Sequence, residues 1–157
     1  MTKRYKVYIL QGVPGSGKST WITEHLGEMH HAVHGKPKVV SADHFFMRDG
    51  EYRFDVTKLG AAHESCMSDF LDAVTAPLEE RADVVVDNTI ISAIEMAPYY
   101  RAGRAKGFDI VVARFVVDPK VAAARNVHGV PLVAIERMTA GMADPPPFWN
   151  VAFMKAM

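Results

Sequence analysis

A glycine-rich segment near the start of the chain has the residue types and spacing that hold phosphate. Residues 12–19 read GVPGSGKS and fit the pattern G-x-x-x-x-G-K-[ST], known as a P-loop. Its three glycines let the backbone fold around phosphate oxygens with the N–H groups pointing inward. We expect Lys18 to reach the β- and γ-phosphates and the Ser19 hydroxyl to bind Mg²⁺. The residues expected to bind ATP, or another nucleoside triphosphate, are Gly12, Pro14, Gly15, Ser16, Gly17, Lys18, Ser19 and Thr20.

Two aspartates follow apolar runs further along the chain. Asp43 comes after "VVSA" and Asp87 after "VVV". If both runs are strands of one parallel sheet, the two carboxylates lie beyond its carboxyl edge, where such sheets bind ligands. A carboxylate there can hold Mg²⁺ or accept the proton of an attacking hydroxyl, although either aspartate could instead cap the next helix.

Residues that would support guanine recognition or hydrolysis are missing from the sequence. It contains no Asn-Lys-x-Asp segment, and Asp87 is followed by Asn88 rather than by a glutamate that could activate water. The pattern therefore favours transfer of a phosphoryl group to a hydroxyl, which is kinase chemistry.

Strand-like and helix-like segments alternate along the chain. The apolar, β-branched runs at 5–11, 38–42, 82–88 and 108–117 predict four strands, most of them covered on both faces. Helices are expected at 18–25, 56–74, 92–106, 119–127 and 131–142. This order predicts one α/β domain over residues 1–157, a three-layer αβα sandwich with a parallel sheet and the P-loop kinase fold.

The segment after the fourth strand has the properties of a lid. In small P-loop kinases, arginines of such helices neutralise charge on the transferring phosphoryl group. The lid is expected at about 119–142, with Arg125 and His128 on one helical face and a turn at Gly129 and Pro131. The tail, 143–157, is expected to lie over the core through its aromatic residues Phe148 and Trp149.

Composition limits the other possibilities. Eighteen basic and eighteen acidic residues cancel, so a nucleic-acid partner would need a local basic patch. The single cysteine, Cys66, excludes an internal disulfide and fits a reducing compartment. No apolar run approaches the roughly 20 residues that span a bilayer. A cytoplasmic protein without a membrane partner is expected, and its oligomeric state is left open.

Two further groups of side chains have more than one interpretation. Basic and aromatic residues interleave at 99–107 and could follow a nucleic-acid strand, but the exposed end of a helix is the better interpretation. His30, His31 and His34 lie in an expected loop without partners suited to zinc, so we interpret them as structural or solvated.

Four segments together resemble the polynucleotide-kinase-like P-loop proteins, which include the kinase domain of phage polynucleotide kinase and eukaryotic relatives. They read "GVPGSGKST", "DGEYRFDVTKLGAAHE", "DNT" and "RNVHGVP", and the resemblance covers about residues 7–142. It implies transfer of the γ-phosphate of a nucleoside triphosphate, with Mg²⁺, to a hydroxyl of DNA or RNA. The typical acceptor is the 5′-hydroxyl of a single strand or end.

The resemblance also implies roles for individual residues. Asp43 matches the general base, and Asp87 matches the second acidic residue near the acceptor, which we also expect to hold Mg²⁺ with Ser19. Lys18 and Arg125 match the cations that contact the phosphates, Arg125 as the lid arginine.

The chain departs from the family on the acceptor side. Phe46 stands where the phage enzyme has an arginine, and "DNTI" and "AHESC" replace "DNTN" and "AHEWN". Other acceptors therefore stay open: a modified base such as a 5-hydroxymethyl pyrimidine in DNA, a nucleoside or a small metabolite. A non-catalytic ATP-binding module is a further alternative. The acceptor-side residues are expected to be Asp43, Phe46, His63, Asn88, Thr89 and His128.

Overall fold

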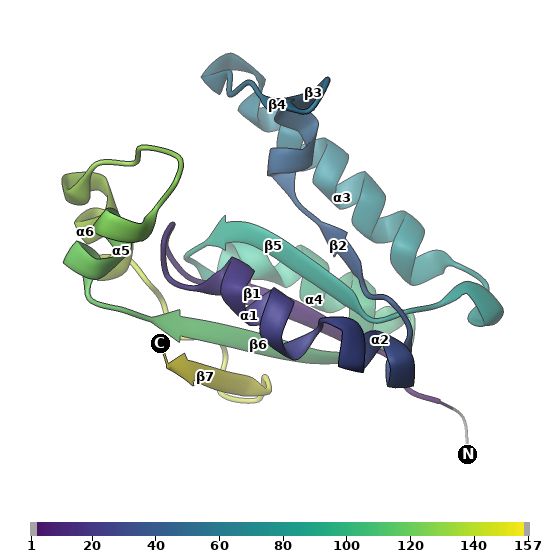
Figure 1. Ribbon diagram of the computed structural model, residues 1–157. Coiled ribbons are helices and arrows are strands. Elements are labelled where there is room, and N and C mark those ends of the chain that lie inside the picture. The colour runs from purple at the N-terminus through teal and green to yellow at the C-terminus, as the bar shows by residue number, and fades with distance from the viewer. Residues whose placement is uncertain (1–2, 156–157) are drawn as a thin grey trace.

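A five-stranded parallel sheet forms the centre of the molecule, of which the computed structural model describes residues 3–155 (Figure 1). Its strand order is β2-β5-β1-β6-β7, and all four pairings are parallel. The strands are β1 (Lys6–Gln11), β2 (Lys38–Val40), β5 (Val84–Ile90), β6 (Asp109–Val116) and β7 (Val151–Lys155).

Helices cover both faces of this sheet. The longer helices are α1 (Lys18–His25), α2 (Glu28–His34), α3 (Leu59–Thr75), α4 (Ala93–Ala105), α5 (Pro119–Arg125) and α6 (Leu132–Ala140). Phe70 of α3 and Met96 of α4 are buried against one face, whereas Trp21 of α1 is buried against the other. The expected three-layer αβα arrangement with a parallel sheet is therefore confirmed. None of the helices within residues 3–155 has the length and apolar character needed to cross a membrane.

The two faces of the sheet are built from alternate residues of the same strands. In β1, Val7 and Ile9 face α3 and α4, whereas Leu10 faces α1, and all three are fully buried. Strands that are buried on both faces read as continuous apolar runs, which is why these strands could be recognised in the sequence.

The lid is a pair of short helices joined by a loop. Buried Ala122 of α5 and Ile135 of α6 pack together against Val13 of the P-loop. The expected helix 119–127 ends already at Arg125, so the prediction that Arg125 and His128 share one helical face is wrong. The chain leaves the helix here because the Asn126 side chain bonds to the loop that follows.

The C-terminal segment is more ordered than the sequence indicated. Instead of an irregular tail, residues 151–155 form β7, which pairs with β6 at the edge of the sheet. Trp149 is buried, as expected, and its ring stacks on Tyr100 of α4 with centroids 4.1 Å apart and planes at 8°. Phe148, by contrast, is 79% exposed, so it does not pack on the core.

Two segments predicted differently form regular structure. His30, His31 and His34 lie in helix α2, not in a loop. Residues 47–52 form a hairpin of β3 (Met47–Arg48) and β4 (Glu51–Tyr52), whose turn has positive φ angles at Asp49 and Gly50. An Asp-Gly turn of this kind matches the twist of a hairpin, and the dipeptide was a signal for it. Short 3₁₀ helices lie on either side of the hairpin: η1 (Ala42–Phe46) and η2 (Val56–Lys58). A third, η3 (Leu78–Glu80), precedes β5.

Replacing Trp149 with alanine is expected to destabilise the fold. The substitution removes a buried ring that stacks on α4 next to β7, and truncations of this kind cost about 3 kcal/mol or more. Phe148→Ala is the matched control, because an exposed ring contributes within about 0.5 kcal/mol. Urea unfolding of both variants measures the difference, and equal free energies of unfolding would show that the tail does not pack as described.

Candidate active site

A cavity of about 930 Å³ opens at the carboxyl edge of the sheet, beside the P-loop. Among its lining residues are most of those expected in the site, from Pro14 to Thr20 of the P-loop together with Asp43, Asp87, Asn88, Thr89, Arg125 and His128. They come from four places in the chain, and the parallel strand order brings them to one edge. Residues 125–128 of the lid line one side of this cavity. The β3–β4 hairpin lies across from the lid (Figure 1).

The P-loop has the shape of a phosphate cradle. Gly15 has a φ of 80°, and a Cβ at this position would collide with the backbone carbonyl of Ala122 in the lid, so only glycine fits. Gly17, with a φ of 101°, precedes the first turn of α1 and lets the N–H groups of that turn face the cavity. The Ser16 hydroxyl is buried and has no hydrogen-bond partner within residues 3–155, which leaves it free for a phosphate oxygen.

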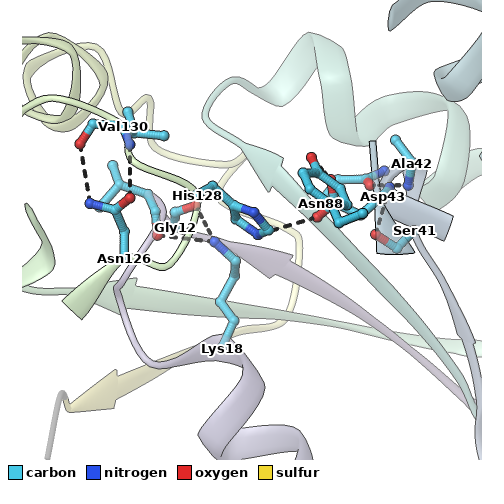
Figure 2. A network of polar contacts seen from close by, with 11 residues as sticks. Gly12, Lys18, Ser41, Ala42, Asp43, Asn88, Asn126, His128 and Val130 are labelled. Carbon is cyan, nitrogen blue, oxygen red and sulfur yellow. Dashed lines mark hydrogen bonds and ion pairs between the residues drawn. The ribbon is translucent and has the colours of Figure 1, made fainter. Parts of the chain in front are cut away.

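Lys18 is bound to the loop itself in this structure. Its ammonium group donates hydrogen bonds to the carbonyls of Gly12, at 2.7 Å, and Val13, at 3.0 Å (Figure 2). Burial lowers the pKa of Lys18 from 10.5 to about 8, although the nearby carboxylates of Asp87 and Asp43 oppose this shift. A phosphate anion bound beside Lys18 would favour the charged ammonium and raise this pKa again.

Asp87 lies in β5 on the wall of the cavity. Burial raises the pKa of its carboxyl above the usual range, the Lys18 ammonium opposes this rise, and the charge of Asp43 adds to it. A cation bound here would relieve the repulsion between the two carboxylates. With the Ser19 hydroxyl, Asp87 offers oxygen ligands suited to Mg²⁺, which takes its other ligands from water and phosphate oxygens. The Ser19 hydroxyl and the Asp87 carboxylate therefore fit a magnesium ion and would hold it beside the nucleotide.

The backbone around Asp43 is fixed by two polar side chains. The buried Asn88 accepts a hydrogen bond from the Ala42 N–H at 2.8 Å, and its own amide donates to the sulfur of Cys66 at 3.3 Å. The Ser41 hydroxyl accepts the Asp43 N–H at 3.1 Å. These bonds attach the start of η1 to β5, so that the Asp43 carboxylate faces the cavity (Figure 2). Asn88 was expected on the acceptor side, and its side chain holds the backbone at Ala42 in place.

Tyr52 of the hairpin holds one oxygen of this carboxylate. Its hydroxyl donates to Asp43 Oδ1 at 3.0 Å. Burial, followed by the hydrogen bond and the charge of Asp43, raises the pKa of Tyr52 to about 12. The phenol therefore stays protonated near neutral pH and remains a donor.

His128 of the lid approaches the other oxygen of the same carboxylate. Its Nε2 lies 3.9 Å from Asp43 Oδ2, and its ring lies 4.9 Å from the ring of Tyr52, centroid to centroid. Figure 2 shows the imidazole reaching from the lid loop across the cavity toward Asp43. The lid and the hairpin therefore meet at the expected general base.

Asn126 shapes the loop that carries His128. Its amide donates to the carbonyls of Ala123, at 2.8 Å, and Val130, at 3.1 Å, and its oxygen accepts the Val130 N–H at 2.9 Å. These bonds close the turn over Gly129, whose φ is 68°. The expected turn at Gly129 is confirmed, and Pro131 then caps the start of α6.

Two residues expected on the acceptor side do not line the cavity. The Phe46 ring is buried among the aromatic rings of the hairpin, because an apolar side chain at this point packs inward. His63 lies on the exposed face of α3.

Tyr52 and Asn126, by contrast, were not expected in the site. Both occur in the segments that carry the family resemblance, "DGEYRFD" and "RNVHGVP", which was the available signal.

The cavity extends beyond the P-loop toward the edge strand β7. Trp21, Glu24 and His25 of α1 and Phe153 and Met154 of β7 line this part. Arg125, at the end of α5, has an exposed side chain and also lines the cavity, as expected of a lid arginine. The reach of the cavity from Lys18 to β7 leaves room for the rest of a nucleotide.

Comparison with known proteins supports this description of the fold. A family model described as an AAA domain matches residues 7–141. The human protein NEDD4-binding protein 2 is 32% identical over an alignment of 134 residues that covers 83% of this chain. The chain spans only 7% of the length of that relative.

Two solved structures share the fold at low sequence identity. A candidate kinase from Chloroflexus aurantiacus is 15% identical with a TM-score of 0.69, over 99% of this chain and 87% of that chain. A gluconokinase from Sinorhizobium meliloti is 16% identical with a TM-score of 0.60, over 98% of this chain and 85% of that chain. The chain therefore has the P-loop kinase fold.

Nucleotide binding is expected to take up a proton at alkaline pH. The pKa of Lys18 is about 8 in the free protein, and bound phosphate anions favour the charged ammonium, so the pKa rises on binding. Affinity for ATP should fall as the pH rises from 8 to 10, toward about tenfold per pH unit. Calorimetry at pH 8.5 in two buffers of different ionisation enthalpy measures the uptake, since the phosphates of ATP are fully ionised there. Binding without proton uptake at this pH would contradict the buried position of Lys18.

Asn126→Ala is expected to loosen the lid loop. The variant loses three hydrogen bonds that hold the turn, so the Val130 N–H should exchange with solvent about tenfold faster or more. Val127→Ala, at a side chain 88% exposed, serves as the control. Hydrogen exchange resolved by residue measures both, and an unchanged rate at Val130 would show that Asn126 does not hold the loop.

Proposed function

Because the chain belongs to the AAA-domain family of P-loop proteins with a kinase-like fold, we propose that it is an ATP-dependent kinase acting on nucleic acid. The proposed acceptor is the 5′-hydroxyl of a polynucleotide. The observation that carries this proposal is the position of Asp43, whose carboxylate lines the same cavity as Lys18 and the P-loop. A donor phosphate and a general base then face one another across a single open cavity.

The proposed reaction is an in-line displacement at the γ-phosphorus. The acceptor oxygen forms the new bond to phosphorus, and its proton passes to a carboxylate oxygen of Asp43. The bond between phosphorus and the bridging oxygen of ADP breaks, and ADP leaves with that electron pair. The hydroxyl of Tyr52 occupies one side of the carboxylate at 3.0 Å, so the other oxygen is the one that receives the proton.

Cations of the site stabilise the charge that develops during the transfer. Lys18 would move from the carbonyls of Gly12 and Val13 to the phosphates, and Arg125 would approach from the lid. Mg²⁺, held by Ser19 and Asp87, would supply further neutralisation of the phosphate oxygens. Lid closure also excludes water from the transferring group.

The polar side chains around Asp87 favour phosphoryl transfer to a hydroxyl over hydrolysis by water. Glu24, Asp43 and Asp87 are the acidic side chains that line it within residues 3–155. Asp87 is followed by Asn88, whose amide is already bonded to Ala42 and Cys66 and so is not free to orient an attacking water. A hydroxyl that displaces water from Asp43 is the substrate that this arrangement suits.

Labelled ATP and a panel of acceptors test the proposal. Radiolabel from the γ-phosphate should appear on 5′-hydroxyl DNA or RNA oligonucleotides, and not on the same oligonucleotides with a 5′-phosphate. Label found only on base-modified DNA, nucleosides or small metabolites would overturn the acceptor assignment. Absence of label from every acceptor, with ATP still bound, would indicate a non-catalytic ATP-binding module.

Asp43→Asn tests the role of the base. The substitution keeps the size of the side chain but removes the proton acceptor, so turnover should fall by about two to four orders of magnitude. Affinity for ATP should change little, as measured by calorimetry. Asp49→Asn is the matched control, since Asp49 is an exposed carboxylate in the nearby hairpin turn and asparagine tolerates its φ of 52°. If both variants retain full turnover, Asp43 is not the base.

A further inference from the structure

A second, smaller groove lies on the hairpin beside the cavity. Its volume is about 230 Å³. Three phenylalanines line it, Phe45, Phe46 and Phe54, together with Arg48, Arg53, Lys58 and one acid, Asp55. We call this site the hairpin groove. Neither the P-loop nor the lid contributes to it, so it is a separate feature of the surface.

The hairpin groove is linked to the proposed acceptor side of the cavity by η1, which contributes residues to both. Phe45 and Phe46 lie in the same 3₁₀ helix as Asp43, two and three residues further along. Tyr52, which donates to Asp43, also stacks on Phe54 with centroids 6.5 Å apart and planes at 16°. An acceptor whose reacting hydroxyl lies at Asp43 would therefore pass over Tyr52 to reach the groove.

The cations of the groove are available to a ligand. Arg48 and Lys58 are exposed and form no ion pair within residues 3–155. Arg53 pairs with Glu51 at 3.0 Å, but both side chains are exposed, and such a pair contributes little.

The acid of the groove is occupied elsewhere. The Asp55 carboxylate accepts hydrogen bonds from the Thr57 N–H, at 3.0 Å, and the Thr57 hydroxyl, at 2.6 Å, and so caps η2. These hydrogen bonds, together with the charge of Lys58, lower the pKa of Asp55, so its carboxylate stays charged with Oδ1 bonded to Thr57. Among the residues that line the groove, three cations therefore stand with one acid.

An exposed aromatic ring stands among these cations. The Phe54 side chain is 56% exposed, and its ring rests on the buried Phe46, with centroids 5.1 Å apart. The two ring planes are tilted by 59°, and the exposed part of the Phe54 ring is an apolar surface on which a base can stack. Bases stacked on aromatic rings, with the backbone phosphates along flanking cations, are the usual mode of binding single-stranded nucleic acid.

We propose that the hairpin groove binds the single strand that leads away from the acceptor hydroxyl. A base near the 5′ end stacks on Phe54, and the neighbouring phosphates pair with Arg48 and Lys58. The proposal rests on the proposed function, since it assigns the polynucleotide acceptor of that reaction to a surface. It also accounts for Phe46, which supports the stacking ring from below instead of contacting the acceptor at the cavity.

Fluorescence anisotropy tests binding without any turnover. The probe is a labelled oligothymidylate of eight residues with a free 5′-hydroxyl. Phe54→Ala is expected to weaken its binding about tenfold or more. The double variant Arg48→Ala, Lys58→Ala should also weaken binding, and should reduce the slope of log affinity against log salt by about 1.4, or about 0.7 for each phosphate contact.

Matched variants far from the groove serve as controls. Phe148→Ala removes another exposed ring, and Arg101→Ala with Arg104→Ala removes two exposed cations of α4. Both controls should bind like the unchanged protein. Thermal unfolding of every variant shows that the substitutions, which lie at exposed side chains, leave the fold intact. Equal effects of groove and control variants would overturn the proposal.

Two further measurements separate the possible outcomes. The ratio of kcat/KM on the octamer to that on a nucleoside 3′-phosphate should fall in the groove variants. If every variant transfers phosphate and this ratio is the same in all of them, the proposed role of the groove is wrong, but the proposed kinase activity still stands. If the groove variants bind the oligonucleotide more weakly but no variant, nor the unchanged protein, transfers phosphate, the groove binds the strand and the proposed kinase activity is wrong. Competition by polyglutamate as strong as that by unlabelled oligonucleotide would overturn the assignment to nucleic acid.

Discussion

Parallel pairing of β2, β5 and β1 is the constraint on which the rest of the site depends. Parallel neighbours end at the same edge, so the residues that follow β1 and β2 and the end of β5 itself meet there. The P-loop follows β1 and Asp43 follows β2. Asp87 is the central residue of β5 and comes directly after Val86, which pairs with Val40 at the end of β2. A shift of one residue in the register of β5 would turn Asp87 away from the cavity and Val86 toward it.

Asn88 fixes the position of Asp43 relative to this shared edge. Strand pairing alone places Asp43 only roughly, because η1 is a short helix on a connection that leaves the sheet. The amide of Asn88 is buried and bonded on both sides, to the Ala42 N–H and the Cys66 sulfur, and an unpaired buried amide would be costly. Tyr52 and His128 then approach Asp43 from the hairpin and the lid, so the position of the proposed base depends on three separate parts of the chain.

The sequence predicted the elements whose signals are local. The P-loop, the four buried strands and the long helices follow from residue spacing and apolar runs. The strand β7 could not be predicted, because it pairs at an edge and is held by the stacking of Trp149 on the distant Tyr100. The C-terminal end of α5 and the path of the lid loop depend on the side chain of Asn126, which no periodicity reveals. Phe46 was expected on the acceptor side because of the family resemblance. Its burial depends instead on tertiary contacts with Phe45 and Phe54.

We propose that donor and acceptor meet in one cavity between Lys18 and Asp43. A crystal structure with ADP, Mg²⁺, aluminium fluoride and a 5′-hydroxyl oligonucleotide would show whether they do. We expect the Lys18 ammonium to leave the Gly12 and Val13 carbonyls for the fluoride and phosphate oxygens. We also expect the 5′-oxygen to lie in line with the aluminium and within hydrogen-bond distance of Asp43. A water molecule in that position, with the oligonucleotide bound away from Asp43 or not bound at all, would contradict it.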